Sequence, residues 1–105
     1  MINQKYANYE SGAWSSASTL PYKAYESGAI VYNNEIHIFG GQDSGSNPDI
    51  RTHYKYNGST WTKLNDLPIN AYRATAVLYD NEIHTIFRIG PYEGDHTYHY
   101  KFNGS

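Results

Sequence analysis

Short apolar runs separated by turn residues make up most of the chain, and none of them shows the 3.6-residue period of a helix. Residues 28–33 are apolar and end at Asn33 and Asn34, and the next run ends at Gly40 and Gly41. Asn tolerates a positive φ, so the Asn pair predicts a tight hairpin turn. The pattern predicts antiparallel strands over residues 28–33, 35–39, 51–56, 60–64, 74–79, 82–87 and 97–102.

Turn residues divide these strands into two sets. Asn57-Gly58 is the strongest short hairpin signal in the chain, and Asp80-Asn81 stands at the turn of the second set. Leu67-Pro68 ends the first set, because proline has no N–H to donate to a sheet. We expect loops over residues 42–49 and 91–95, and two stray strands over residues 5–9 and 14–16.

The two sets repeat each other. Trp14 and Trp61 are 47 residues apart, residues 34–37 return as 81–84, and residues 53–59 return as 99–105 with one substitution. A period in the forties indicates a repeat architecture. We expect one domain of two units, about 13–59 and 60–105, with residues 1–12 as an N-terminal extension.

Composition narrows the function classes. The chain of 105 residues has a net charge of −2, no cysteine and twelve tyrosines. We therefore expect no nucleic-acid partner, no thiolate chemistry and a core built on tyrosine rings. No apolar run is long enough to span a membrane, and the N-terminal residues do not resemble a signal peptide, so we expect no membrane partner and leave the compartment open.

The first unit resembles the kelch repeat, whose period is near fifty residues. The apolar run of residues 29–39, the pair Gly40-Gly41, and Tyr56 followed by Trp61 match the kelch pattern, as does Leu67-Pro68. The second unit departs from it at residues 87–90, where the glycine pair is missing.

This resemblance implies an all-β fold of kelch-type β-propeller blades, each a four-stranded antiparallel sheet. With two blades per chain, the propeller would close by oligomerisation. Four residues are expected to have structural roles: Trp14 and Trp61 as anchors packed between blades, and Gly40 and Gly41 where the chain leaves the second strand.

Histidines occupy repeat-related positions, namely His37 with His84 and His53 with His99. Two readings are open, a metal site lining a propeller channel or packed, hydrogen-bonded rings. We favour packed rings, because no further ligand lies at i+2 or i+4 in these strands. We expect no metal, no cofactor and no catalytic residues.

The loops between successive strands favour one face for binding. In an up-and-down blade, the longer connections emerge together on one side, and Tyr and Arg are favoured interface residues. The kelch resemblance implies binding on that face. The predicted binding residues are Tyr22, Tyr25, Tyr72, Arg73, Asp43, Asn47, Arg51 and Tyr92.

Three functions follow as hypotheses. The first is a non-catalytic protein-interaction or scaffold module that self-assembles into a full propeller. The alternative is a carbohydrate-binding module of lectin type, since aromatic rings and polar side chains share the loops. An enzyme is the third, because some kelch-like propellers catalyse reactions.

Two blades leave strand edges and sheet faces uncovered, which predicts association with further copies of the chain. A ring of such chains holds an even number of blades, so we expect a trimer of six, with a tetramer of eight as the runner-up. The segment around Trp14 is expected to supply the fourth strand of a neighbour's second blade. The protein or glycan ligand of the assembly stays open.

Overall fold

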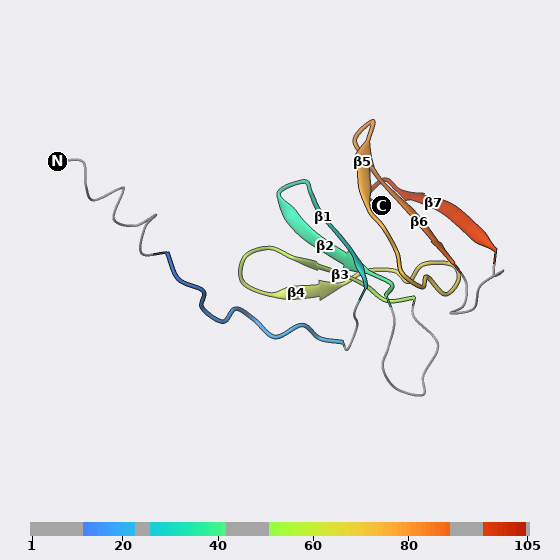
Figure 1. Cartoon of the computed structure of the whole chain (residues 1–105). Helices are drawn as coiled ribbons and strands as arrows, with labels where there is room; N and C mark the ends of the chain where they lie inside the picture. The colour runs from blue at the N-terminus through green and yellow to red at the C-terminus, as the bar shows by residue number, and fades with distance from the viewer. Residues whose placement is uncertain (1–11, 23–25, 42–50, 89–95, 105) are drawn as a thin grey trace.

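The chain folds into two antiparallel sheets in a computed structural model that describes residues 12–22, 26–41, 51–88 and 96–104 (Figure 1). The first sheet has the order β1 (Gly28–Tyr32), β2 (Glu35–Phe39), β3 (His53–Tyr56) and β4 (Trp61–Lys63). The second has the order β5 (Val77–Tyr79), β6 (Glu82–Arg88) and β7 (Thr97–Phe102). All-β folding into four-stranded and three-stranded sheets is therefore confirmed.

The described residues include no helix, and hence no helix long and apolar enough to cross a membrane. Each sheet is built from neighbouring strands in sequence order, as expected for an up-and-down unit. In Figure 1 the second sheet lies beside β1 and β2, while residues 12–20 run away from both sheets.

The tight turns between paired strands have the predicted conformation. Asn33 and Asn34 have φ of 50° and 65°, and Asp80 and Asn81 have φ of 52° and 61°. Positive φ at both central residues defines the turn that matches the twist of a hairpin. Register follows from it, because Tyr32 pairs with Glu35 and Tyr79 pairs with Glu82.

The hairpin at Asn57 closes differently. Its side-chain oxygen accepts hydrogen bonds from the backbone N–H groups of Ser59 and Thr60, at 2.9 and 3.0 Å. Only Gly58 of this turn has a positive φ, at 101°. The Asn57 side chain thus adds two hydrogen bonds to the backbone bond that Asn57 donates to the Thr60 carbonyl at 3.3 Å.

The strand predicted over residues 74–79 is shorter than expected. The strand begins only at Val77, and Arg73, just before the predicted start, has a φ of 53°. Pairing with β6 still extends before Val77, because Thr75 donates to the Ile86 carbonyl and Tyr72 exchanges two backbone bonds with Arg88. The segment before Val77 therefore stays attached to β6 although it lies outside the strand.

The strand predicted at residues 14–16 is absent from the described chain. Residues 12–20 form no ladder, and Trp14 is fully exposed. Residues 5–9, its predicted partner, lie outside the described residues. Within the chain itself Trp14 is therefore not packed, and its expected role as an anchor between blades stays a prediction.

The core lies between the two sheets. It consists of buried residues from both sheets and from the segment that joins them: Tyr32, Phe39, Ala71, Ala74, Ile83 and Phe87. Aromatic rings fill much of this space, as the tyrosine-rich composition predicts.

Gly40 lets the joining segment approach the first sheet. It has a φ of 62°, and a Cβ there would lie 2.7 Å from the Ala71 carbonyl oxygen. Gly41 donates its N–H to the same oxygen at 2.8 Å. The second sheet has no glycine at this position. Phe87 lies 47 residues after Gly40, and β6 continues through Phe87 to Arg88.

Candidate interaction surfaces

Two histidine pairs occupy equivalent places in the two sheets. Nδ1 of His37 lies 2.9 Å from Nε2 of His53, and Nδ1 of His84 lies 2.8 Å from Nε2 of His99. Sequence reasoning found each position and missed the pairing. The signal was present, because both repeats place two histidines about fifteen residues apart on paired strands.

The first pair is buried and neutral. Burial, and then the neighbouring His37, lowers the pKa of His53 to about 4, and burial lowers the pKa of His37 as well. A hydrogen bond between two ring nitrogens needs one N–H and one lone pair, which two charged rings cannot provide. His37 and His53 are therefore packed, hydrogen-bonded rings, as the sequence suggested.

Strand register divides each sheet into two faces, because residues directly opposite each other share a face. We call the side that carries the histidine pair the histidine face. In the first sheet it comprises Ile30, Tyr32, His37, Phe39 and His53, and in the second Val77, Tyr79, His84, Ile86 and His99.

The opposite side is the isoleucine face. In the first sheet it includes Val31, Ile36 and Ile38, and in the second Leu78, Ile83, Thr85 and Phe87. Within the chain, the histidine face of the first sheet packs on the isoleucine face of the second. The ring of Phe102, opposite Ile83, lies 4.9 Å from His53 and 6.2 Å from Tyr32 between ring centroids.

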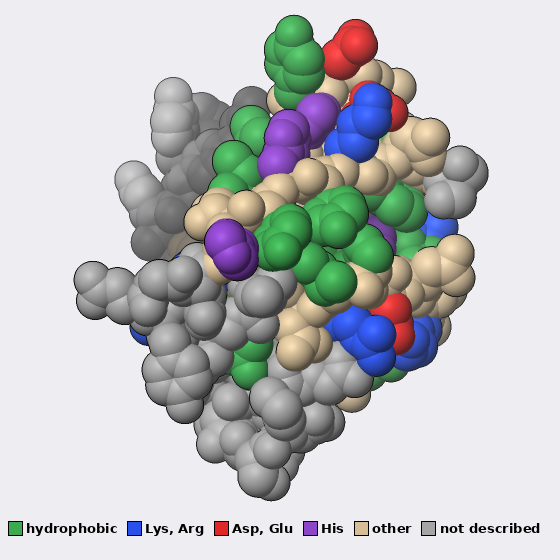
Figure 2. Space-filling model, turned by 90° about the vertical axis from the view of Figure 1, so that its right-hand side faces the viewer, with side chains coloured by type: hydrophobic (Ala, Val, Ile, Leu, Met, Phe, Trp, Pro, Cys, Tyr) green, Lys and Arg blue, Asp and Glu red, His purple; other side chains and the backbone are tan. Residues whose placement is uncertain are grey.

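The described residues leave two faces largely uncovered. Tyr32 is 5% exposed and its counterpart Tyr79 is 71% exposed, while Phe39 is 3% exposed and Ile86 is 50% exposed. On the far side of the first sheet, Val31 and Ile36 are also exposed. Figure 2, which views the molecule from the side of the second sheet, shows hydrophobic side chains gathered with histidines at their border.

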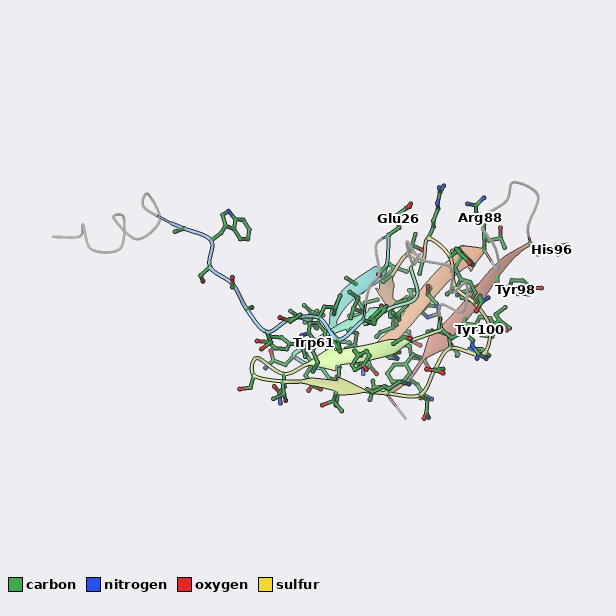
Figure 3. The ribbon with its side chains drawn as sticks, turned by 90° about the horizontal axis from the view of Figure 1, so that it is seen from below. Glu26, Trp61, Arg88, His96, Tyr98 and Tyr100 are labelled. Atoms are coloured by element: carbon green, nitrogen blue, oxygen red, sulfur yellow. The ribbon has the colours of Figure 1, made fainter. Side chains whose placement is uncertain are left out.

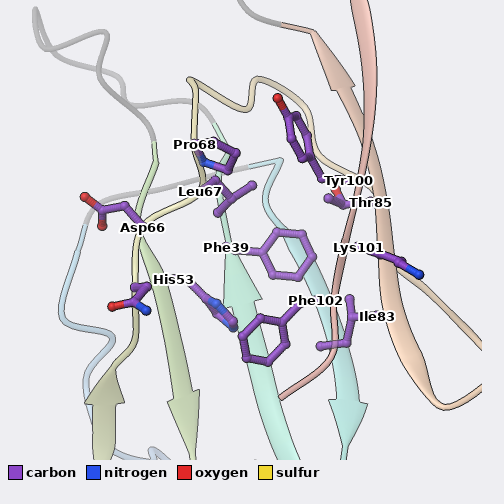
Figure 4. Close-up of a pocket in the computed structure, with 11 residues that line it drawn as sticks. Phe39, His53, Asp66, Leu67, Pro68, Ile83, Thr85, Tyr100, Lys101 and Phe102 are labelled. Carbon is purple, nitrogen blue, oxygen red and sulfur yellow. The ribbon is translucent and has the colours of Figure 1, made fainter. Parts of the chain in front are cut away.

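A cavity opens between the two sheets. Its volume is about 260 Å³, and Phe39 and His53 face Phe102 and Ile83 across it (Figure 4). The hydroxyl of Thr85 lines it without a hydrogen-bond partner among the described residues. A second hollow of about 360 Å³ adjoins residues 63–65 and also touches Phe102.

The predicted loop face is only partly described. Tyr25, Asp43, Asn47 and Tyr92 lie outside the described residues, and Arg51 leads into β3. Arg73 forms an ion pair with Glu26 at 3.2 Å. Glu26 and Arg88 point to the same side of the molecule in Figure 3, away from Trp61.

Two tyrosines of that prediction are held in the fold. Tyr22 donates its hydroxyl to the Gly40 carbonyl at 3.1 Å and stacks on Tyr54, and burial raises its pKa. Tyr72 is 6% exposed, so it is not presented on the loop face as predicted. Its backbone exchanges two hydrogen bonds with Arg88 of β6.

Trp61 packs within its own sheet, and its expected role as an anchor between blades stays a prediction. It is half-buried, its ring lies 4.9 Å from Tyr56, and its Nε1 donates to the Ser18 carbonyl at 3.4 Å. In the described part of the chain, no group of three or more His, Asp or Glu side chains is arranged to hold a metal ion.

Comparison with known proteins agrees with the blade architecture. Over 41 residues the chain is 44% identical to a Kelch domain-containing protein of Saccharolobus solfataricus. The match covers 38% of this chain and 6% of the length of that relative. No family model matches the chain. Two antiparallel sheets and this short match to a kelch protein are consistent with kelch-like blades.

Proposed function

We propose that the chain is a non-catalytic interaction module whose two blades bind further copies of the same chain. The exposed histidine face of the second sheet would dock on the exposed isoleucine face of the first sheet of the next copy. One observation carries this proposal. Each exposed face is the repeat counterpart of a face whose central residues are buried inside the chain, namely Phe39 and His53 in the first sheet and Ile83 and Phe87 in the second.

The physical reason is that the docking geometry already exists once. Tyr32, Phe39 and the first histidine pair are buried by the second sheet, and Tyr79, Ile86 and the second pair offer the same arrangement outward. Exposed apolar patches of this kind mark interaction sites. A second copy of the chain carries the isoleucine face that matches this histidine face, so a second copy is the proposed partner.

Charge supports the same partner. Glu26 and Arg73 are 47 residues apart, both have positive φ, and they pair across the two blades. In a ring of copies, each Arg73 would next meet a Glu26 of the following copy. Opposite charges would then alternate at every junction, which favours this head-to-tail order over like-with-like docking.

Repetition of one head-to-tail contact forms a ring when the rotation closes. Propellers contain four to eight blades, so two-blade chains give a tetramer at most. The proposed assembly is a trimer of six blades, with a tetramer of eight as the alternative. The match spans only 6% of the kelch relative's length. The competing explanation is therefore that further blades of one longer polypeptide cover the two exposed faces.

Native mass spectrometry and light scattering of the 105-residue chain test the proposal. We expect a trimer or tetramer, and a monomer when Ile86→Arg places a charge on the histidine face. Thr60→Arg, in the exposed turn before β4, is the matched control and should keep the mass. A wild-type chain that stays a folded monomer at high micromolar concentration would overturn self-docking. The exposed faces would then be explained by further blades in a longer polypeptide.

Carbohydrate binding stays a prediction. Its expected residues are the loop residues, of which Tyr25, Asp43, Asn47 and Tyr92 lie outside the described chain. A glycan array on the assembled protein measures it directly.

A further inference from the structure

β7 has one edge with no strand beside it in the described chain. The second sheet has the order β5, β6, β7, whereas in the first sheet β4 covers the corresponding edge of β3. An open edge exposes a row of backbone N–H and C=O groups that can pair with another strand. The first sheet shows what such a strand looks like, because β3 and β7 share their sequence pattern.

The exposed segment around Trp14 has the sequence position of that strand. Trp14 precedes Trp61 by 47 residues, and Leu20-Pro21 precedes Leu67-Pro68 by the same interval. Residues 14–16 therefore correspond to the three residues of β4. They form no ladder in the chain, and Trp14 is fully exposed.

The segment is anchored at one end and points outward. Ser18 donates its hydroxyl to the Ser59 carbonyl at 3.2 Å and accepts from Trp61 at 3.4 Å. These bonds hold residue 18 against the outer edge of the first sheet. Residues 12–17 extend beyond it, away from the β7 edge of their own chain (Figure 1).

Room for the indole ring is already present at β7. In the first sheet Trp61 lies opposite Tyr56, and their ring centroids are 4.9 Å apart. Phe102 has the place of Tyr56, because it lies opposite Ile83 as Tyr56 lies opposite Ile36. The hollow of about 360 Å³ between residues 63–65 and β7 borders Phe102.

We propose that residues 14–16 of a second copy add to β7 as its fourth, antiparallel strand and place Trp14 in the hollow beside Phe102. The register follows from β3 and β4, in which Tyr56 faces Trp61 and Lys55 faces Thr62. Trp14 of the second copy therefore faces Phe102, and its Ser15 faces Lys101. This inference rests on the proposed self-docking and names the segment that seals each junction.

The chain has no cysteine, so an engineered pair reports this register directly. The double variant Ser15→Cys with Lys101→Cys should form a disulfide between chains, because directly opposite residues have Cβ atoms about 4.5–5.5 Å apart. Oxidised protein should run as covalent oligomers on a denaturing gel. Ser15→Cys with Thr97→Cys is the matched control, since four residues along a strand move the partner by about 13 Å.

Trp14→Ala tests the same contact without a new bond. Loss of an aromatic anchor at an interface should raise the dissociation constant of the assembly by at least about tenfold. The far-UV spectrum and melting temperature of the dissociated monomer should not change, because Trp14 has no packing in the chain to lose.

Failure of this inference differs from failure of the proposed function. Strand addition would be overturned if the wild-type chain forms an oligomer, the Trp14→Ala variant keeps the same mass, and the cysteines at positions 15 and 101 stay reduced. Face-to-face docking would then remain intact. A disulfide formed within one chain would also overturn it. A monomeric wild type would overturn both.

Discussion

The two sheets carry the same histidine pair and differ in what covers it. His37 and His53 lie under the second sheet, with the ring of Phe102 against both. His84 and His99 make a hydrogen bond of nearly the same length on an open face. The internal geometry of a pair is therefore set by its own strands, while its burial depends on the neighbouring blade.

The comparison extends to the whole face. Ile30, Tyr32 and Phe39 pack into the core, and Val77, Tyr79 and Ile86 occupy the same register positions in the open. In a repeat protein, each repeat contacts its neighbour through the same kind of interface. Under the proposed self-docking, the open histidine face of the second sheet is where the next copy would bind.

Truncation of the equivalent tyrosine in each sheet should give the largest difference in unfolding free energy between the buried and the exposed histidine face. Tyr32→Ala removes a buried ring and should lower the free energy of unfolding by about 3–5 kcal/mol. Tyr79→Ala, at the equivalent exposed position, should change it by less than about 0.5 kcal/mol. Urea unfolding at concentrations where both variants are monomeric measures the difference. Equal losses would mean that the second sheet's face is covered within the chain.

Acid should destabilise the protein through the first histidine pair. The folded pKa of His53 is about 4 and its unfolded value is about 6.5. Between these values the unfolded chain binds a proton that the folded chain does not. The free energy of unfolding should therefore be highest above about pH 6.5 and fall by up to about 3 kcal/mol as the pH drops to about 4.

A matched pair of variants assigns this slope. His53→Gln should flatten the pH dependence of the unfolding free energy, whereas His99→Gln, in the exposed pair, should keep it. Urea titrations at successive pH values measure both. A slope that survives His53→Gln would place the acid-sensitive group elsewhere.

Gly40 tests the difference between the sheets at the end of the second strand. Gly40→Ala introduces a Cβ about 2.7 Å from the Ala71 carbonyl at a φ of 62°, and should cost about 2 kcal/mol or more. Gly58→Ala at a φ of 101° has open space around it, so it carries the backbone cost alone and should lose less. Thermal unfolding compares them. A smaller loss at Gly40 than at Gly58 would argue against the close approach of Ala71.

Charge reversal should have the smallest effect. Glu26→Arg or Arg73→Glu alone should weaken the contact between blades by less than about 1 kcal/mol, since the pair is exposed. The double variant, with the charges exchanged, should restore it. A double-mutant cycle on the assembly midpoint measures the coupling, and additive losses would show that the two side chains do not interact.

Local sequence determined the strands and turns closely. Asn33-Asn34 and Asp80-Asn81 lie where the hairpin turns were expected, and β2 has the predicted bounds. These features depend on residues that are neighbours in the chain, and Asn adopts positive φ readily. The late start of β5, at Val77 and not at residue 74, and the φ of 53° at Arg73 were not predictable, because nothing in these residue types demands them.

The tertiary structure decided which copy of each repeated residue is buried. Tyr32 and Tyr79, or His37 and His84, have the same sequence surroundings, so local pattern treats them alike. Their exposure differs because a sheet face is buried only when another blade lies against it. Pairing of the histidines and the covering of Tyr72 likewise depend on residues far apart in the chain. The sequence therefore determined the strands and their repetition, and packing between the two sheets determined which faces are buried.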